Sequence, residues 1–322
     1  MKRSTSAFVT LLGLVFSTSI ALCDDKPKII SVKKIWNEGT HNAFTDLIRF
    51  KGSWWCTFRE AAAHGNGALG KARVIVSKDG AEWKSAALLE EKGVDLRDPK
   101  LSITPDGFLM LIMGGSIYEG KVYKTRAPRV AFSKDGSDWT QPKKLLAEDH
   151  WLWRVTWHDG WAWSVSKLGE GRDPRRGMLY RSRDGIDWQW ITEFRLPNKT
   201  WNASETTLRF MPDGELVALT RPHWIGTSKP PYTEWSWTKI PTGLGGPNFI
   251  RTPNGKLWAS SRNNGTTVLA RMTRTTYEPV LTLPSGGDTS YPGMVWYKGQ
   301  LWLSYYSSHE GQTSIYLAVI EL

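Results

Sequence analysis

The chain has 322 residues, a formal net charge of +11 and 19 tryptophans. Its basic residues are dispersed among apolar runs and turns and form no concentrated patch, which argues against a nucleic-acid partner. Only two cysteines are present, which excludes a disulfide framework, and no stretch beyond residue 22 is apolar enough to span a membrane. A chain of this composition depends on a packed core for its stability.

The first segment has the pattern of a secretory signal peptide. Residues 1–3 form a basic start, residues 7–22 are apolar, and the chain then turns polar. We expect cleavage after Cys23, so that residues 24–322 are exported to the periplasm or the extracellular space as one domain. The apolar run is short and contains Ser and Thr, which disfavours a membrane anchor. Cleavage removes Lys2 and Arg3, so the mature chain has 40 basic and 31 acidic side chains and a formal charge of +9.

Two kinds of turn repeat along the rest of the chain. The phrase Ser-x-Asp-Gly-x-x-Trp occurs at residues 77–83, 133–139 and 182–188, each time after a short apolar run. Its Ser and Asp side chains can accept hydrogen bonds from loop N–H groups, and its Gly supplies a positive φ. The second kind is a glycine turn between apolar strands, repeated at intervals of 41 to 55 residues. Six glycines mark this turn: Gly52, Gly107, Gly160, Gly214, Gly255 and Gly299.

These repeats predict the fold. Repeats of 40 to 55 residues that read as four strands are typical of the blades of a β-propeller. Six glycine turns therefore predict an all-β, six-bladed β-propeller of four-stranded antiparallel blades. The last blade lacks an outer turn and needs one more strand. Residues 29–36 are apolar and β-branched, and we predict that they close the ring as the outer strand of that blade.

Polar residues recur where each predicted blade begins and where its second strand ends. In a propeller these positions face one rim of the central channel, and a ligand site should draw residues from several blades there. Trp151, Trp153, Trp157 and Trp224 lie near strand ends or in loops and are candidates for stacking on sugar rings, whereas the other tryptophans are expected to pack between blades. The polar rim residues are His41, Asn42, Arg59, Glu60, His64, Arg97, Asp98, Arg154, Glu205, Arg221, Arg262 and Tyr291.

The chemistry of this set indicates an acidic sugar ligand. Arginines form planar, two-point hydrogen bonds with carboxylates, and the positive charge of the chain agrees with an anionic partner. A Tyr beside a Glu can act as a nucleophile, because the carboxylate takes the phenol proton as the oxygen attacks carbon. A second carboxyl group or a His would then protonate the leaving group.

These features together resemble the sialidase (neuraminidase) superfamily, over about residues 33–322. The outer turn resembles its Asp-box, or BNR repeat, although it is one residue shorter, and six blades is the fold of that superfamily. The resemblance implies that Glu205, at the start of blade four, is the base and that Arg221 binds the carboxylate. Tyr291, at the start of the last blade, matches the nucleophile. Arg262 is the candidate for another carboxylate-binding arginine, with Arg251 as the weaker choice.

The sequence departs from the superfamily pattern at two places. His41-Asn42-Ala43-Phe44 stands where the superfamily has its first carboxylate-binding arginine, so Arg59 or Arg97 would have to replace it. The loop after the second strand of blade one contains no Asp. His64 and Glu60 are therefore the candidates for the proton donor.

The leading hypothesis is an exported, retaining, exo-acting sialidase-like glycoside hydrolase that cleaves an acidic glycan. Tyr291, Glu205, His64 and Glu60 are its candidate catalytic residues. Two alternatives stay open: a non-catalytic glycan-binding propeller, and a polysaccharide lyase acting on uronate-containing glycans. No cofactor is expected, and the six scattered histidines show no metal-ligand spacing. The oligomeric state is left open. The candidate substrate-binding residues are Arg59, Arg97, Asp98, Arg154, Arg221, Arg262, His41 and Asn42.

Overall fold

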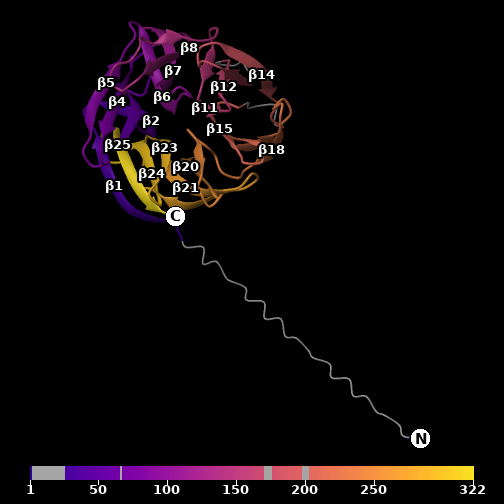
Figure 1. Cartoon of the computed structure of the whole chain (residues 1–322). Helices are drawn as coiled ribbons and strands as arrows, with labels where there is room; N and C mark the ends of the chain where they lie inside the picture. Colours follow the sequence, from indigo (N-terminus) through magenta and orange to yellow (C-terminus); the bar gives the residue numbers. More distant parts are fainter. Residues whose placement is uncertain (2–25, 66, 170–175, 198–202) are drawn as a thin grey trace.

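The computed structural model of the chain describes residues 1, 26–65, 67–169, 176–197 and 203–322. These residues form strands and contain no α-helix, so none of them forms a helix that could cross a membrane. The predicted signal peptide falls outside the described residues except for its first residue, and it stays a prediction. The strands form six antiparallel sheets around a ring (Figure 1). The predicted all-β, six-bladed propeller is confirmed.

Each blade runs outward from its first strand, and the first strand of the third blade is split in two. Blade one contains β2 (His41–Phe50), β3 (Ser53–Ala61), β4 (Lys71–Ser77) and β5 (Lys84–Leu89). Blade two contains β6 (Val94–Ile103), β7 (Leu109–Glu119), β8 (Val122–Ser133) and β9 (Lys143–Lys144). Blade three contains β10 (His150–Leu152), β11 (Thr156–His158), β12 (Trp161–Leu168), β13 (Arg176–Ser182) and β14 (Trp188–Phe194).

The second half of the ring follows the same order. Blade four contains β15 (Thr206–Phe210), β16 (Leu216–Thr220), β17 (Trp224–Ser228) and β18 (Ser236–Lys239). Blade five contains β19 (Asn248–Arg251), β20 (Leu257–Asn263), β21 (Thr266–Met272) and β22 (Tyr277–Thr282). Blade six contains β23 (Thr289–Tyr297), β24 (Gln300–Ser307), β25 (Ser314–Glu321) and, from the other end of the chain, β1 (Lys28–Trp36).

The ring is closed by strands from both ends of the described chain. β1 pairs antiparallel with β25, and its register places Lys28 opposite Glu321 and Trp36 opposite Ile315. The predicted closure by residues 29–36 is therefore confirmed. The N-terminal strand supplies hydrogen bonds that the outer edge of β25 would otherwise leave unmade.

The outer turns have the hydrogen bonds that their sequence predicts. In the first, the Gly80 N–H donates to Ser77 Oγ at 2.8 Å, and the Ala81 N–H donates to Asp79 Oδ1 at 2.8 Å. The Trp83 indole N–H donates to the Gly80 carbonyl at 3.1 Å. The same pattern recurs at residues 133–139 and 182–188. Side chains thus satisfy the loop backbone, as turn chemistry requires.

The glycines of these turns also fit against the preceding blade. A Cβ added at Gly80 would lie 2.5 Å from the Trp302 ring, and one added at Gly136 would lie 2.3 Å from the Trp55 ring. Trp302 in turn stacks on Trp54 at a centroid distance of 4.4 Å. Much of the tryptophan content therefore packs one blade on the next, which accounts for the repeated Gly and Trp positions.

Gly136→Ala is expected to destabilise the protein by about 2–4 kcal/mol in urea denaturation, because it combines backbone strain with overpacking. Gly136 has a φ of +89° and has no room for a methyl group beside Trp55. Gly52→Ala is the matched control, since Gly52 has a φ of +75° but nothing lies within 4 Å of an added Cβ. We expect a loss of only about 1–2 kcal/mol there. Equal losses would show that the contact between blades contributes nothing.

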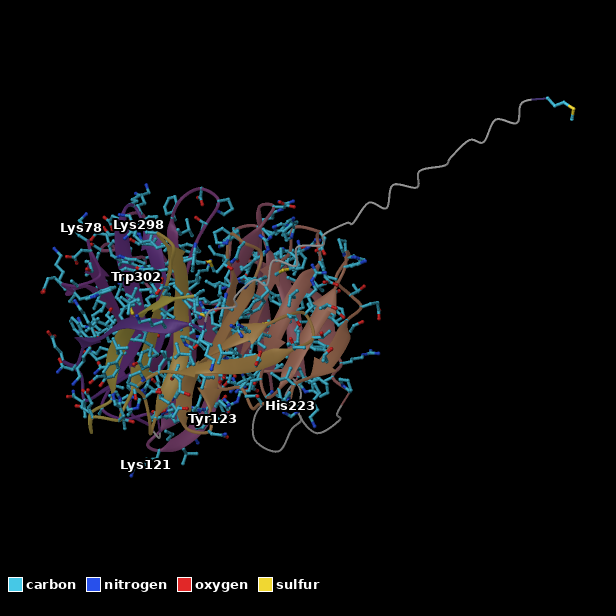
Figure 2. All side chains as sticks on the ribbon, turned by 90° about the horizontal axis from the view of Figure 1, so that it is seen from below. Lys78, Lys121, Tyr123, His223, Lys298 and Trp302 are labelled. Atoms are coloured by element: carbon cyan, nitrogen blue, oxygen red, sulfur yellow. The ribbon has the colours of Figure 1, made fainter. Side chains whose placement is uncertain are left out.

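The two faces of the ring carry different features. Figure 2 shows Lys78, in an outer turn, and Lys298, in an inner turn, on one face, with Trp302 deeper in the molecule on the same side. Lys121 and Tyr123, from the hairpin that joins β7 to β8, lie on the opposite face. The face opposite the turns is the one that holds the candidate site.

Candidate functional site

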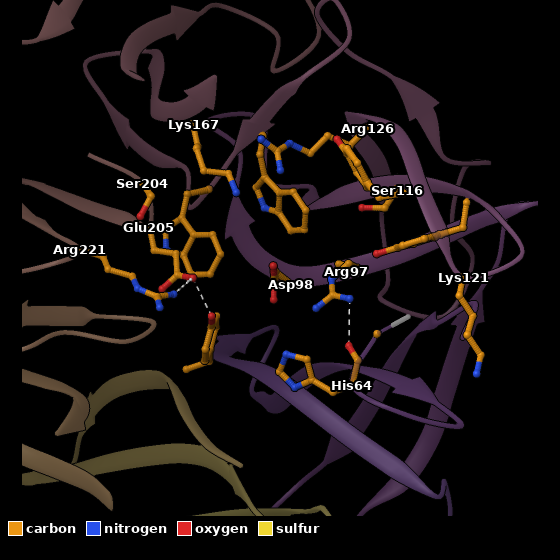
Figure 3. A pocket seen from close by; sticks show the side chains of 16 residues that line it. His64, Arg97, Asp98, Ser116, Lys121, Arg126, Lys167, Ser204, Glu205 and Arg221 are labelled. Carbon is orange, nitrogen blue, oxygen red and sulfur yellow. Dashed lines mark hydrogen bonds and ion pairs between the residues drawn. The ribbon is translucent and has the colours of Figure 1, made fainter. Parts of the chain in front are cut away.

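A cavity of about 470 Å³ opens on this second face, in the size range of small-molecule pockets. Residues from blades one, two, three, four and six line it, as expected for a rim site in a propeller. The lining residues are His64, Gly65, Arg97, Asp98, Ser116, Tyr118, Lys121, Tyr123, Arg126, Trp151, Trp153, Lys167, Ser204, Glu205, Arg221 and Tyr291 (Figure 3).

Strand irregularities aim two of these side chains into the cavity. β6 shifts register between Arg97 and Lys100, and β23 shifts register between Ser290 and Gly293. Within the shifts, Asp98 has a φ of 50° and Tyr291 has a φ of 55°. Positive φ is uncommon for such residues, and bulges of this kind redirect side chains next to functional sites. The neighbouring strand β2 has the same irregularity, which places Phe44 against Tyr291 at a ring distance of 4.9 Å.

Tyr291, Glu205 and Arg221 form a hydrogen-bonded group in the cavity. The Tyr291 hydroxyl donates to Glu205 Oε1 at 2.6 Å, and Arg221 Nη1 donates to the same oxygen at 2.9 Å. The Gly246 N–H donates to Glu205 Oε2 at 2.7 Å. Glu205 directly precedes β15 and Arg221 directly follows β16, so one hairpin holds both side chains. The arrangement is a phenol held by a carboxylate that is itself neutralised by a guanidinium.

The electrostatics fix the protonation of this group. Burial alone would raise the pKa of Glu205, but the charge of Arg221 and the hydrogen bonds from Tyr291 and the Gly246 N–H together lower it. Burial and the Glu205 charge raise the pKa of Tyr291 well above its ordinary value. The resting state therefore pairs a neutral phenol with an ionised carboxylate.

Gly246 is needed where it stands. It has a φ of +61°, and a Cβ added there would lie 2.5 Å from the Tyr291 ring. A residue with a side chain would push the phenol away from Glu205. The loop that supplies the N–H to the carboxylate also provides the space for the ring.

Asp98 lies in the centre of the view in Figure 3, between Glu205 and Arg97. Its side chain is buried, and burial raises its pKa above the ordinary value, although Arg97 and Lys100 oppose the shift. Lys100 is buried beside the rings of Trp153 and Tyr291, and its Nζ donates to the carbonyls of Phe44 and Pro99. Burial lowers the pKa of Lys100 to about 8.

His64 lines the cavity and belongs to a cluster of side chains from three segments of the chain. Its Nδ1 lies 2.6 Å from Asp288 Oδ2, and His41 Nε2 lies 2.9 Å from the same oxygen. The Tyr306 hydroxyl donates to Asp288 Oδ1 at 2.9 Å. Among the described residues, His41, His64 and Asp288 are the one group whose ligand atoms are close enough to share a metal ion, all within 4.8 Å. Hydrogen bonds and ion pairing already account for this cluster.

Two of the arginines predicted to bind substrate have buried partners instead. Arg59 is fully buried and donates to Asp95 Oδ1 at 2.7 Å. Arg154 donates to Asp46 Oδ1 at 2.6 Å and to the Pro292 carbonyl. Neither is part of the cavity lining in the part of the chain that the structure describes. Arg59 thus joins blade one to blade two, whereas Arg154 joins blade three to blades one and six across the centre of the ring.

Four more predicted residues also lie outside that lining, among the described ranges. Glu60 accepts two hydrogen bonds from Arg73, each at 2.9 Å. Arg262 donates to the Thr289 carbonyl at 3.1 Å, and Asn42 donates to the carbonyls of Gly39 and Thr313. His41, the fourth, contacts Asp288, and its ring packs edge-on against the ring of His64. Of the predicted set, the cavity brings together His64, Arg97, Asp98, Glu205, Arg221 and Tyr291.

Sequence analysis missed one wall of the cavity. Tyr118 and Lys121 belong to the hairpin of β7 and β8, whose strands of 11 and 12 residues are the longest in the described chain. Trp151 and Trp153, two of the proposed sugar platforms, do line the cavity. Trp157 and Trp224 are not part of the lining that the described residues form. A strand pattern extending past the usual blade length was the available signal.

Comparisons with known proteins place the fold. No protein-family model and no curated protein matches the chain. Among solved structures, a protein of unknown function from Dyadobacter fermentans is similar with a TM-score of 0.82 at 18% identity, over 92% of this chain and 99% of that one. An α-L-arabinofuranosidase from Fusarium graminearum gives a TM-score of 0.71 at 13% identity, over 90% and 97% of the two chains.

Trypanosoma rangeli sialidase is also similar, with a TM-score of 0.69 at 12% identity over 87% of this chain. The chain spans only 55% of that sialidase. In its fold the protein is thus a sialidase-like six-bladed propeller, and its structural neighbours include glycoside hydrolases.

Proposed function

We propose that the protein is an exported glycoside hydrolase that releases a sugar from the end of an acidic glycan. The observation that carries this proposal is the 2.6 Å hydrogen bond from the Tyr291 hydroxyl to Glu205, inside a cavity of sugar size. A phenol in contact with an ionised, arginine-paired carboxylate has what nucleophilic catalysis requires. Export rests on the predicted signal peptide at residues 1–23.

The mechanism would be a retaining one with Tyr291 as nucleophile, because Glu205 is placed to accept the proton of the Tyr291 hydroxyl. The Tyr291 oxygen attacks the anomeric carbon while its proton passes to Glu205, and the bond from that carbon to the leaving oxygen breaks. The leaving oxygen takes a proton from an acid in the cavity. Water then attacks the anomeric carbon and gives one proton to the conjugate base of that acid, the bond to Tyr291 breaks, and Glu205 returns its proton to the phenol oxygen.

The charge of the lining supports an acidic substrate. Five basic side chains line the cavity with two acidic ones, Asp98 and Glu205. Arg221 and Arg97 line the cavity, whereas Arg59, Arg154 and Arg262 are not part of the lining formed by the described residues, so Arg221 and Arg97 would hold a substrate carboxylate. Trp151 and Trp153 supply apolar ring faces of the kind on which sugars stack. The basic lining residues are Arg97, Lys121, Arg126, Lys167 and Arg221.

Screening the purified full chain against 4-methylumbelliferyl sialosides and uronides, and against oligosaccharides ending in the same sugars, tests this proposal. We expect release of the terminal sugar with retention of its anomeric configuration. Nuclear magnetic resonance of the released sugar measures that configuration. An ultraviolet-absorbing unsaturated product would instead identify a lyase. Binding on a glycan array without any product would identify a non-catalytic propeller.

A further inference from the structure

One carboxyl oxygen in the cavity is buried without a partner. Asp98 is 7% exposed, and its Oδ1 has no hydrogen-bond partner among the described residues. An ionised carboxylate buried in this way would lose the hydration of that oxygen and gain no hydrogen bond in return, whereas a neutral acid loses much less. The geometry therefore favours a protonated side chain that faces the ligand space.

The backbone presents Asp98 and Tyr291 in the same way. Each stands in the register shift of the first strand of its blade, each has a left-handed φ, and each is followed by a proline. Left-handed φ in a residue other than glycine is retained where the surroundings enforce it, often at functional sites. The fold thus delivers a phenol and a carboxyl group to one cavity from equivalent positions of two blades.

Burial and the neighbouring positive charges shift the pKa of Asp98 in opposite directions. Burial favours its neutral form most strongly, and the Glu205 charge adds to this effect. The charges of Arg97, Lys100 and His64 oppose it, yet the pKa of Asp98 remains raised. Glu205 has a lowered pKa in the same cavity. Two carboxyl groups whose environments drive their pKa values apart are the pattern by which enzymes separate an acid from a base.

We propose that Asp98 is the proton donor to the leaving group, an inference that rests on the proposed glycosidase function. As Tyr291 attacks the anomeric carbon, the Asp98 carboxyl group gives its proton to the departing oxygen and becomes a carboxylate. In the second step that carboxylate takes a proton from the water that attacks the anomeric carbon, which restores the acid. No co-reactant other than water is required.

The other candidates fit this role less well. Glu60 is held by Arg73 through two hydrogen bonds and lies outside the cavity lining of the described chain. His64 Nδ1 is engaged by Asp288, and the pKa of Asp288 is lowered by hydrogen bonds from both histidines against the effect of burial. The His64 ring is held at the wall by that cluster, whereas Asp98 lies in the centre of the view in Figure 3.

Comparing leaving groups tests the assignment. Asp98→Asn preserves the size of a neutral acid but has no proton to give, so we expect a loss of about 10²–10⁴-fold on substrates with a sugar leaving group. On 4-nitrophenyl glycosides of the same sugar, whose leaving group needs little protonation, the loss should be below about tenfold. The fall of kcat/KM on the high-pH side of the profile, where wild-type Asp98 loses its proton, should vanish in the variant.

A second measurement does not depend on a substrate. Infrared difference spectra of wild-type protein against Asp98→Asn at about pH 6, above the ordinary Asp pKa of ~3.9, should show the carbonyl band of a protonated carboxylic acid. Absence of that band overturns the proposal. So does equal loss of activity on both kinds of leaving group, or leaving-group dependence that appears in His64→Gln instead. Full activity of Tyr291→Phe, or no turnover of any glycoside by the wild type, would count against the proposed function. In that case the infrared carbonyl band would still decide whether Asp98 is protonated.

Discussion

Tyr291→Phe is expected to lower kcat by about 10³-fold or more, because loss of a catalytic nucleophile leaves only binding and electrostatic effects. The substitution removes one oxygen and keeps the ring, which packs on Phe44 at 4.9 Å and on Trp153 at 5.5 Å. Glu205 keeps its bonds to Arg221 and the Gly246 N–H, so the cavity should hold its shape. We therefore expect binding of the substrate, measured by calorimetry, to change by less than about tenfold.

Tyr305→Phe is the matched control for that experiment. Tyr305 is a fully buried tyrosine of the same blade, and its hydroxyl donates to the Pro284 carbonyl at 2.8 Å. It is not part of the cavity lining formed by the described residues. Its variant should lose about 1 kcal/mol of stability and keep its activity. If Tyr291→Phe turned over substrate as fast as this control, the nucleophilic mechanism would be wrong.

The architecture could be predicted because each blade contains turns whose residues form a local motif, and these motifs repeat along the sequence. The inner turn of each blade requires a residue with positive φ, which favours glycine. The number and spacing of these glycines therefore gave the number of blades without knowledge of any distant contact. The proximity of Glu205 to Arg221 follows from one hairpin, whose register sets Thr206 opposite Thr220, although Arg221 was predicted to bind the substrate carboxylate and not Glu205.

The rest of the site depends on contacts between blades, which a single sequence does not display. Arg59 and Arg97 occupy similar rim positions, yet one is buried against Asp95 of the next blade and the other lines the cavity. The cluster of His41, His64 and Asp288 joins residues 224 and 247 positions apart, far beyond any metal-ligand spacing. The shared proline after Asp98 and Tyr291 was a visible sign of their equivalence.

Arg59→Met is expected to lower the free energy of unfolding by about 3 kcal/mol in urea denaturation, because it removes the closer of the two arginines that pair with a fully buried carboxylate and leaves only Arg97, at 3.3 Å. Arg59 and Asp95 both have fully buried side chains and lie 2.7 Å apart. Arg59 also donates to the carbonyls of Ala63 and Ala68, at 2.7 and 2.6 Å, which would lose those bonds. Removing this one guanidinium therefore loosens the loop that carries His64.

Arg176→Met provides the comparison for a surface pair. Arg176 makes two hydrogen bonds to Glu193, at 3.0 and 2.9 Å, but its side chain is 45% exposed. Its loss should cost less than about 1 kcal/mol, since exposed pairs are already solvated. Arg59 was first predicted to hold the substrate. If Arg59→Met kept full stability while the substrate affinity fell, that prediction would be right, and Arg59 would have to turn from Asp95 toward the cavity when a ligand binds.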